Sequence, residues 1–385
     1  MTGVSSVFPA PLTWFQKLLF AVTVVLFFLT YPLLEPPYMS GPRWFGFLFL
    51  PMILIMAVNF YRSIRRHQRL PLEWLAAAYL VAQVPTCLTS LDGFGGEAPP
   101  LNYWTTVISC VTAVWLLNEL LSSPRYDSGI GSRIAALVVP FLFGATILFL
   151  WEVITRGFGV PFILLPPPSA IGARIASSVP TLAADVRQTI LKAVLFGYVV
   201  GCAAGFAIAI LADRVDFLRR GLLPIGNFVS ALPIIGIAPI MVIWFGFDWH
   251  SKAAVVIVMT FFPMLVNTVA GLGAAGHMER DLMRTYASNY WQTLFKLRLP
   301  AAMPFIFNAL KINSTLALIG AIVAEFFGTP IVGMGFRIST EIGRLNLDMV
   351  WAEIAVAALA GSIFYGVIAL AERATTFWHP SIRGG

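Results

Sequence analysis

Charged side chains are scarce in this sequence, and histidine is rarer still. Of the 385 residues only 11% are Asp, Glu, Lys or Arg, whereas 58% are hydrophobic. Soluble globular chains carry about 25% charged residues, so a soluble fold is excluded and an integral membrane protein is indicated. The wide spacing of the four histidines excludes one shared metal or catalytic centre; they are His67, His250, His277 and His379.

Signatures of ATP hydrolysis and of other catalysis are also missing. The chain has no phosphate-binding loop of the form G-x-x-x-x-G-K-[ST], no H-E-x-x-H pair and no G-x-S-x-G turn. Carboxylates are paired at Asp213/Asp216 and Glu279/Asp281, but these pairs stand in basic loops, where solvated surface is expected. The sequence therefore predicts no catalytic residue, no metal site, no enzymatic activity and no cofactor bound by this chain.

Long apolar runs fill most of the chain instead. A helix of about 20 apolar residues crosses the roughly 30 Å of hydrocarbon in a bilayer. We therefore predict an all-α polytopic membrane protein with about ten transmembrane helices. The expected spans lie near residues 16–34, 44–60, 72–90, 103–122, 134–154, 186–211, 222–245, 254–271, 304–326 and 348–371.

Positive charge is distributed unevenly between the two sides that these spans define. With both termini on one side, that side holds 16 of the 25 Lys and Arg residues, including the Arg62–Arg69 cluster. Positively charged loops face the cytoplasm, so both termini and residues 281–300 are expected there. The net charge of +7 then reflects topology, and no nucleic-acid partner is expected.

Two regions differ in organisation. Residues 1–133 contain four expected spans with short loops, and residues 134–385 contain six spans and the longer connections. Residues 156–188 form one such connection and include three consecutive prolines, Pro166 to Pro168. Because three consecutive prolines cannot sit in a helix interior, we expect an extended crossing over the outer surface.

Few ionisable or polar side chains lie inside the expected spans. Lys311 and Glu325 share one span but stand roughly 21 Å apart along a helix, too far to pair. Lys311 can extend its stem to water. For Glu325, a structural role at a helix end and a role in lining a solute path both stay open. The other residues that could line a path or bond between helices are Asn227, Ser230, Asn267, Asn313 and Ser314.

Residues 281–300 are amphipathic and basic. Apolar pairs recur four residues apart, from Leu282/Met283 to Leu294/Phe295, with polar residues between them. The segment is too polar to span a bilayer, so its apolar stripe either lies on lipid or docks into a groove of a partner. Ser288 and Asn289 favour caps over helix interiors, and we expect the helix to stop and restart there.

The same segment resembles the cytoplasmic loop of binding-protein-dependent ABC importer permeases, which reads E-A-A-x3-G-x9-I-x-L-P. The L-P is matched, Asp281 takes the Glu position, and Ala287 replaces the Gly. Because alanine disfavours positive φ, we expect the turn to avoid it at Ala287 or to place it at Asn289. The resemblance assigns a coupling role, within a loop near 272–303, to Asp281, Leu282, Met283, Arg284, Ala287, Ser288, Tyr290, Trp291, Leu299 and Pro300.

Four further stretches resemble the nitrate, sulfonate, taurine and bicarbonate branch of that family. They are LPPPSAI (165–171), ALPIIGIAPIMVIWFGF (231–247), FFPMLVNTVAGL (261–272) and AEFFGTPIVGMGFRI (324–338). They stand in the family's order and cover about residues 160–385. The four spans of residues 1–133 lie outside the resemblance and form an N-terminal membrane extension.

The resemblance implies a type I importer fold with six core spans, in the bacterial cytoplasmic (inner) membrane. It also implies a permease homodimer, two copies of a separate ABC ATPase that binds ATP and Mg, and a periplasmic or lipid-anchored solute-binding protein. The imported solute is then a small oxyanion, sulfonate or vitamin precursor. The alternative is a secondary active transporter, which would call for intramembrane acid relays or broken helices.

Overall fold

The structure is a computed structural model that describes residues 13–30, 72–94, 98–122, 130–230, 232–328 and 331–377. Every regular element in these ranges is a helix, which confirms the predicted all-α class. Six helical stretches among the described residues are long and apolar enough to cross a membrane. They are Tyr103–Leu121, Ile134–Gly157, Val179–Arg214, Trp249–Gly273, Tyr290–Glu325 and Leu347–Thr375.

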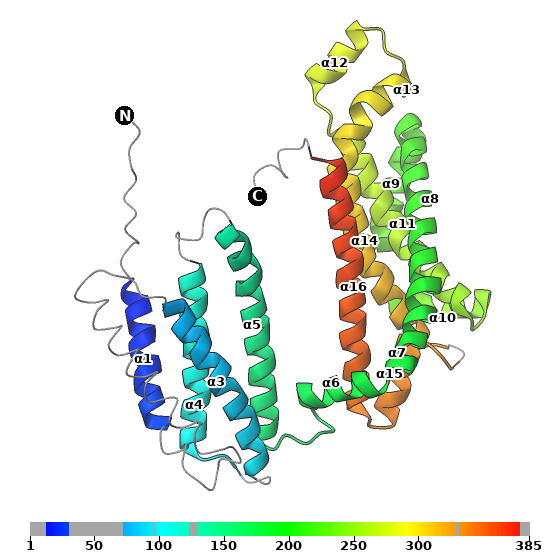
Figure 1. Ribbon diagram of the computed structural model, residues 1–385. Helices are drawn as coiled ribbons and strands as arrows, with labels where there is room; N and C mark the ends of the chain where they lie inside the picture. Colours follow the sequence, from blue (N-terminus) through cyan, green and yellow to red (C-terminus); the bar gives the residue numbers. More distant parts are fainter. Residues whose placement is uncertain are drawn as a thin grey trace, which may run out of the picture. The chain divides into compact units, whose positions relative to one another are not determined.

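The chain divides into two compact units, Met1–Ala170 and Ile171–Gly385 (Figure 1). In the first unit, α4 packs against α1, α3 and α5. Buried hydroxyls join these helices: Tyr79 and Ser109 lie 2.6 Å apart, and Thr23 donates to Thr112 at 3.0 Å. The units divide later in the chain than the expected boundary at residue 133, because α5 packs with α3 and α4. The helices of this unit are α1 (Trp14–Thr30), α3 (Leu72–Gly93), α4 (Leu101–Leu121) and α5 (Ile130–Gly157). The expected span 44–60 lies outside the described residues.

The second unit is built around α11, which packs against α8 and α14 (Figure 1). Small residues allow this close approach: a Cβ added to Gly201 of α8 would lie 2.8 Å from the Ile257 carbonyl of α11. Its main helices are α7 (Val179–Val186), α8 (Leu195–Arg214), α9 (Asp216–Ser230), α10 (Ile234–Phe245), α11 (Trp249–Gly273), α14 (Leu299–Glu325), α15 (Met334–Gly343) and α16 (Leu347–Thr375). A π-helical turn, η3 (Arg187–Val194), joins α7 to α8 without a break.

The expectation of one span at 222–245 is wrong. The helix stops at Ser230, and α10 restarts at Ile234 with Pro233 as its N-cap. Pro233 has no N–H and disfavours helical backbone in the residue before it, which favours a helix break at this point of the apolar run.

The expected extended crossing at 156–188 is also wrong in part, because α6 (Pro168–Ser177) and α7 occupy most of it. Pro168 is the first residue of α6, where its missing N–H costs nothing. The next N–H, of Ser169, donates to the Glu152 carboxylate at 2.8 Å, and the Ser169 hydroxyl donates to it at 2.7 Å. A carboxylate on α5 thus satisfies the start of α6.

Candidate coupling site

A loop of two short helices joins α11 to α14 at one end of the second unit. It contains α12 (His277–Thr285), α13 (Tyr290–Thr293) and a π-helical turn, η4 (Leu294–Arg298), and it stands at the top of Figure 1. The Asn289 side chain accepts from Gln292 N at 2.8 Å, and Gln292 accepts in return from Asn289 N at 2.9 Å. This capping box starts α13, so the predicted stop and restart at Ser288 and Asn289 is confirmed.

The prediction that Ala287 avoids positive φ is wrong. Ala287 has φ 50°, whereas Asn289 has φ −75°. The reason is the way α12 ends: Ser288 N donates to Met283 O at 3.0 Å and Ala287 N donates to Arg284 O at 2.9 Å. These two bonds form a Schellman motif, which requires the left-handed conformation at Ala287. The glycine of the family pattern stands at the same position.

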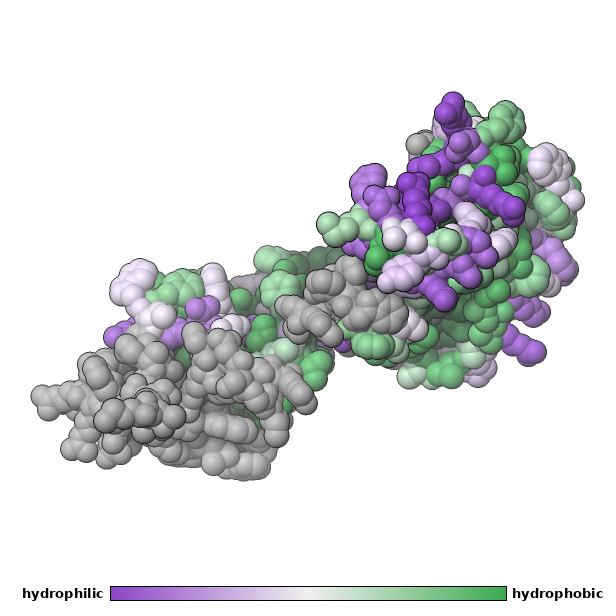
Figure 2. All heavy atoms as spheres, turned by 90° about the horizontal axis from the view of Figure 1, so that it is seen from above, coloured by the Kyte–Doolittle hydropathy of each residue, from purple (hydrophilic) through white to green (hydrophobic). Residues whose placement is uncertain are grey.

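The loop exposes an apolar stripe at a hydrophilic end of the molecule. Met278, Leu282 and Tyr286 recur four residues apart on α12 and are 83%, 56% and 76% exposed. Trp291 and Phe295 of the same loop are also exposed, and their rings are stacked with centroids 6.1 Å apart. Hydrophilic side chains gather at this end of the second unit, while its flanks are hydrophobic (Figure 2). Such a stripe fits docking onto a partner.

The remaining predicted residues of the loop have lesser contacts. Asp281 and Arg284 form an exposed pair at 3.4 Å, which contributes little to stability. Met283 and Ser288 are half-buried beneath the turn, where Ser288 Oγ and Met283 Sδ lie 4.0 Å apart. Leu299 and Pro300 begin α14 and are half-buried.

The base of the loop is tied to α8 by a buried ion pair. Arg298 donates to both Asp213 oxygens, at 2.6 and 2.7 Å, and the Tyr290 hydroxyl donates to Asp213 at 3.0 Å. The guanidinium of Arg214 lies over the rings of Tyr290 and Trp291, 5.7 and 5.9 Å from their centroids. The expectation that Asp213 is solvated surface is wrong. Its partners are 77 and 85 residues away in sequence, so spacing along the chain gave no signal for them.

The polar residues predicted to line a path mostly satisfy nearby backbone groups. Asn313 donates to Thr260 O at 2.8 Å and Asn267 donates to Pro263 O at 2.8 Å. Ser314 donates to a carbonyl of its own helix at 2.7 Å. Asn313 also approaches the sulfur of Cys202 at 3.2 Å, so it joins α8, α11 and α14. The side chains of Asn227 and Ser230 lie outside the described residues.

Lys311 does not extend alone to water. Its ammonium group donates to Glu372 of α16 at 2.7 Å, and both side chains are about one-fifth exposed. This ion pair joins α14 to α16. The charge of Lys311 is therefore accommodated by a partner that is distant in sequence, and not by its side chain reaching water.

Glu325 lies in a polar cluster at the opposite end of the second unit. Its carboxylate accepts from Thr189 Oγ1 at 2.8 Å and from Gly335 N at 2.7 Å. Asp185 accepts from Gly333 N at 2.7 Å and from Arg337 Nε at 2.9 Å. The hydrogen bond to Asp185 raises the pKa of the Arg337 guanidinium. These contacts favour the structural role for Glu325, because its oxygens hold backbone and side-chain donors of this end.

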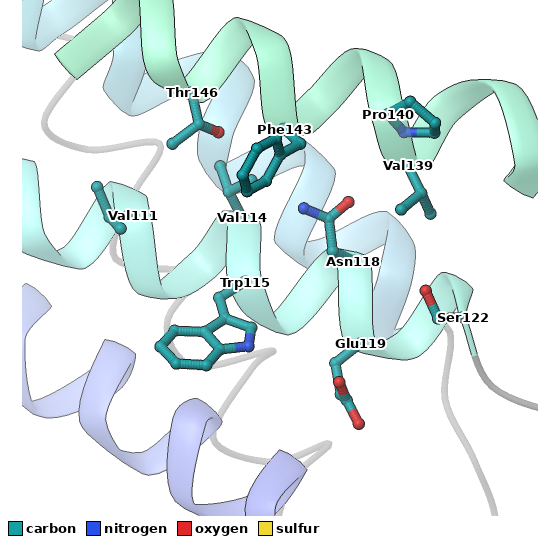
Figure 3. Close-up of a pocket in the computed structure, with 10 residues that line it drawn as sticks. All are labelled: Val111, Val114, Trp115, Asn118, Glu119, Ser122, Val139, Pro140, Phe143 and Thr146. Atoms are coloured by element: carbon teal, nitrogen blue, oxygen red, sulfur yellow. The ribbon is translucent and has the colours of Figure 1, made fainter. Parts of the chain in front are cut away.

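A separate cavity of about 570 Å³ lies in the first unit between α4 and α5 (Figure 3). Val114, Trp115, Asn118, Phe143 and Thr146 are among the residues that line it. Its lining is mainly hydrocarbon, and the residues predicted for coupling or passage lie elsewhere. It holds no arrangement of groups suited to acid–base or nucleophilic chemistry.

The fold and the loop together define a class: a multi-pass membrane transport subunit, with membrane-spanning helices joined by a short amphipathic loop. Residues 197–382 match the family described as the binding-protein-dependent transport system inner membrane component. This match covers most of the second unit, and together with the similar proteins below it supports an ABC importer permease of the branch named above. The match includes α8 to α16 and the whole loop, whereas the first unit precedes it.

Similar proteins agree with this assignment. A formylaminopyrimidine transport permease of Halalkalibacterium halodurans is 29% identical over 239 residues, which are 62% of this chain and 95% of the relative. A putative aliphatic sulfonates transport permease of Bacillus subtilis is 28% identical over 246 residues, with 63% and 88% covered. A taurine transport permease of Escherichia coli is 27% identical over 247 residues, with 60% and 86% covered. The protein is thus a multi-pass inner-membrane transport component, and a secondary transporter is not supported.

Proposed function

We propose that this chain is the permease subunit of an ATP-driven importer and that residues 281–300 receive a separate ATPase chain. The observation that carries the proposal is the exposed apolar stripe of α12, because Tyr286 is 76% exposed at a hydrophilic end of the molecule. A short helix with apolar residues four apart suits a groove on a partner protein. The capping box and the Schellman turn fix the direction in which this stripe points.

The proposed assembly is a permease homodimer with two ATPase copies, which bind ATP and Mg, while this chain binds no cofactor. A solute-binding protein, periplasmic or lipid-anchored, delivers solute to the outer face. The excess of Lys and Arg on one side of the predicted spans supports placing the loop and both termini in the cytoplasm. Closure of the ATPases around nucleotide then moves the loop and shifts the permease between inward-facing and outward-facing states.

The proposed solute is small and belongs to the oxyanion, sulfonate or vitamin-precursor classes. The relatives named for formylaminopyrimidine, sulfonate and taurine transport support this range. Lys311, a charged residue within the helices of the second unit, is paired internally with Glu372. Internal pairing supports the view that selection among solutes rests largely with the binding protein.

Co-purification tests the proposal. The full chain is expressed together with an ABC ATPase from the same genome, and the amount of ATPase retained on the tagged permease is measured. Tyr286→Asp is expected to reduce retention about 30-fold, as loss of an interface hot spot does. Ile342→Asp is the control, because Ile342 is 51% exposed on α15 at the opposite end. Equal retention by both variants would show that the loop is not the ATPase site.

A further inference from the structure

Asp213 stands at the end of α8 and binds the loop formed by α12, α13 and η4, hereafter the coupling loop. The Asp213 side chain is 4% exposed and the Arg298 side chain 15%. Both guanidinium nitrogens of the fork reach the carboxylate, at 2.6 and 2.7 Å. A bidentate pair fixes orientation as well as distance, and separating a buried pair is strongly unfavourable. The loop base and the end of α8 therefore move together.

Arg298 also connects a third helix. Its Nε donates to the carbonyl of Leu272, at the end of α11, at 3.0 Å. The backbone already joins the loop to α11 and α14, since α12 follows α11 and η4 leads into α14. In contrast, α8 precedes the loop by more than two helices in the chain. The polar contacts between α8 and the loop are instead made by side chains, chiefly that of Asp213.

The helix that Asp213 ends is continuous over Val179–Arg214, a stretch of 36 residues. Its first part holds the opposite end of the unit: Asp185 binds Gly333 N and Arg337, and Thr189 Oγ1 accepts from Met334 N at 2.9 Å. Asp185 and Asp213 are separated by about 42 Å along a helix axis. One continuous helical stretch thus carries an anchored acid near each end.

We propose that Asp213 is a positioning residue that transfers movement of the coupling loop to the Val179–Arg214 helix, and that this helix carries the movement to residues 333–337. The proposal rests on the proposed function, because the movement originates in the ATPase. It adds a route that the backbone does not provide. If the ion pair had only a structural role, it would stabilise the loop, but the nucleotide bound to the ATPase would not affect residues 333–337.

The test measures movement at the far end of this helix in the complete complex. A cysteine at Ser339, an exposed residue of α15, is labelled with a water-soluble maleimide, with and without ADP–vanadate trapped on the ATPase. In the otherwise unchanged protein we expect trapping to change the labelling rate about fivefold or more, in the range of typical allosteric coupling. Asp213→Asn is expected to abolish this change while the ATPase stays bound and traps nucleotide.

Two further variants separate coupling from folding. Asp213→Arg combined with Arg298→Asp restores opposite charges and is expected to recover the nucleotide-dependent change in part. Tyr290→Phe removes one hydrogen bond to Asp213 and is expected to reduce the change, so the proposal stays testable if Asp213→Asn does not fold. Asp216→Asn, an exposed acid three residues later, is the matched control and should keep the full change.

The outcomes distinguish this inference from the proposed function. If Asp213→Asn retains the ATPase and shows the same change as the unaltered chain, Asp213 does not transfer the movement. If the unaltered complex shows no change on trapping, the Val179–Arg214 helix does not carry it, and the inference is again overturned. Failure of the unaltered chain to bind any ATPase would instead overturn the proposed function.

Discussion

The two ends of the second unit hold their surface segments by different means. At one end the coupling loop exposes apolar side chains, and its base is held by the ion pair of Asp213 and Arg298. At the other end the carboxylates of Asp185 and Glu325 are buried and accept backbone N–H groups from Gly333 and Gly335. The first end therefore exposes an apolar surface to a partner, whereas at the second end the buried polar groups bind one another.

Removing the guanidinium of Arg298 is expected to destabilise the loop end more than any other substitution proposed here. Arg298→Ala leaves the Asp213 carboxylate buried, with the Tyr290 hydroxyl as its remaining donor among the described residues. Removing one member of a buried pair costs about 3–5 kcal/mol of the free energy of unfolding. Thermal unfolding of the purified permease in detergent measures the loss.

Lys296→Ala is the matched control for that substitution. Lys296 lies in the same π-helical turn, η4, but is exposed, so its loss is expected to change stability by less than about 0.5 kcal/mol. Similar losses in the two variants would mean that the turn, rather than the ion pair, holds the loop.

The second prediction addresses the closed end through Gly333. This residue has φ +145°, and a Cβ there would lie 2.8 Å from Glu325 Oε1. Gly333→Ala therefore combines a backbone conformation that is essentially restricted to glycine with a clash against a buried carboxylate. We expect a loss of about 2–3 kcal/mol, again by thermal unfolding.

Gly343→Ala provides the comparison at the same end of the molecule. Gly333 is the N-cap of α15 and Gly343 is its last residue, but a Cβ at Gly343 would meet nothing within 4 Å and its φ is ordinary. Alanine favours helix over glycine by about 1 kcal/mol, so stability should hold or rise. A loss equal to that of Gly333→Ala would contradict the role assigned to the Glu325 contact.

The same contrast explains what could be predicted from the sequence. The apolar stripe of α12 and the capping at Asn289 follow from residues within a few positions of each other, and both were predicted. The break before Ile234 was missed because the apolar run continues through Pro233, and hydropathy alone does not register a missing N–H. The burial of Asp213 was missed because its cationic partner is 85 residues away. Local patterns reveal faces and caps, whereas ion pairs between distant helices depend on the packed fold.

The third prediction concerns Ala287, the strained position of the coupling loop. Ala287 has φ 50°, a region that costs a residue with a Cβ roughly 1–2 kcal/mol, whereas glycine adopts it freely but loses more chain entropy on folding. Ala287→Gly is therefore expected to stabilise the turn by a net of up to about 1 kcal/mol. Hydrogen exchange of the Ser288 amide, which donates to Met283 O, should slow by up to about fivefold.

Ala274→Gly shows whether that effect is specific to the left-handed turn. Ala274 caps α11 at the start of the same loop, with φ −75°, so glycine brings no relief of strain there. The entropic term alone then remains, and it should weaken the local structure by roughly 0.5–1 kcal/mol. The two alanines, one before α12 and one after it, are thus expected to respond to the same substitution with opposite signs. Faster exchange of the Ser288 amide in Ala287→Gly would mean that the Schellman turn holds Ala287 without strain, and that the alanine in place of the family's glycine costs this loop nothing.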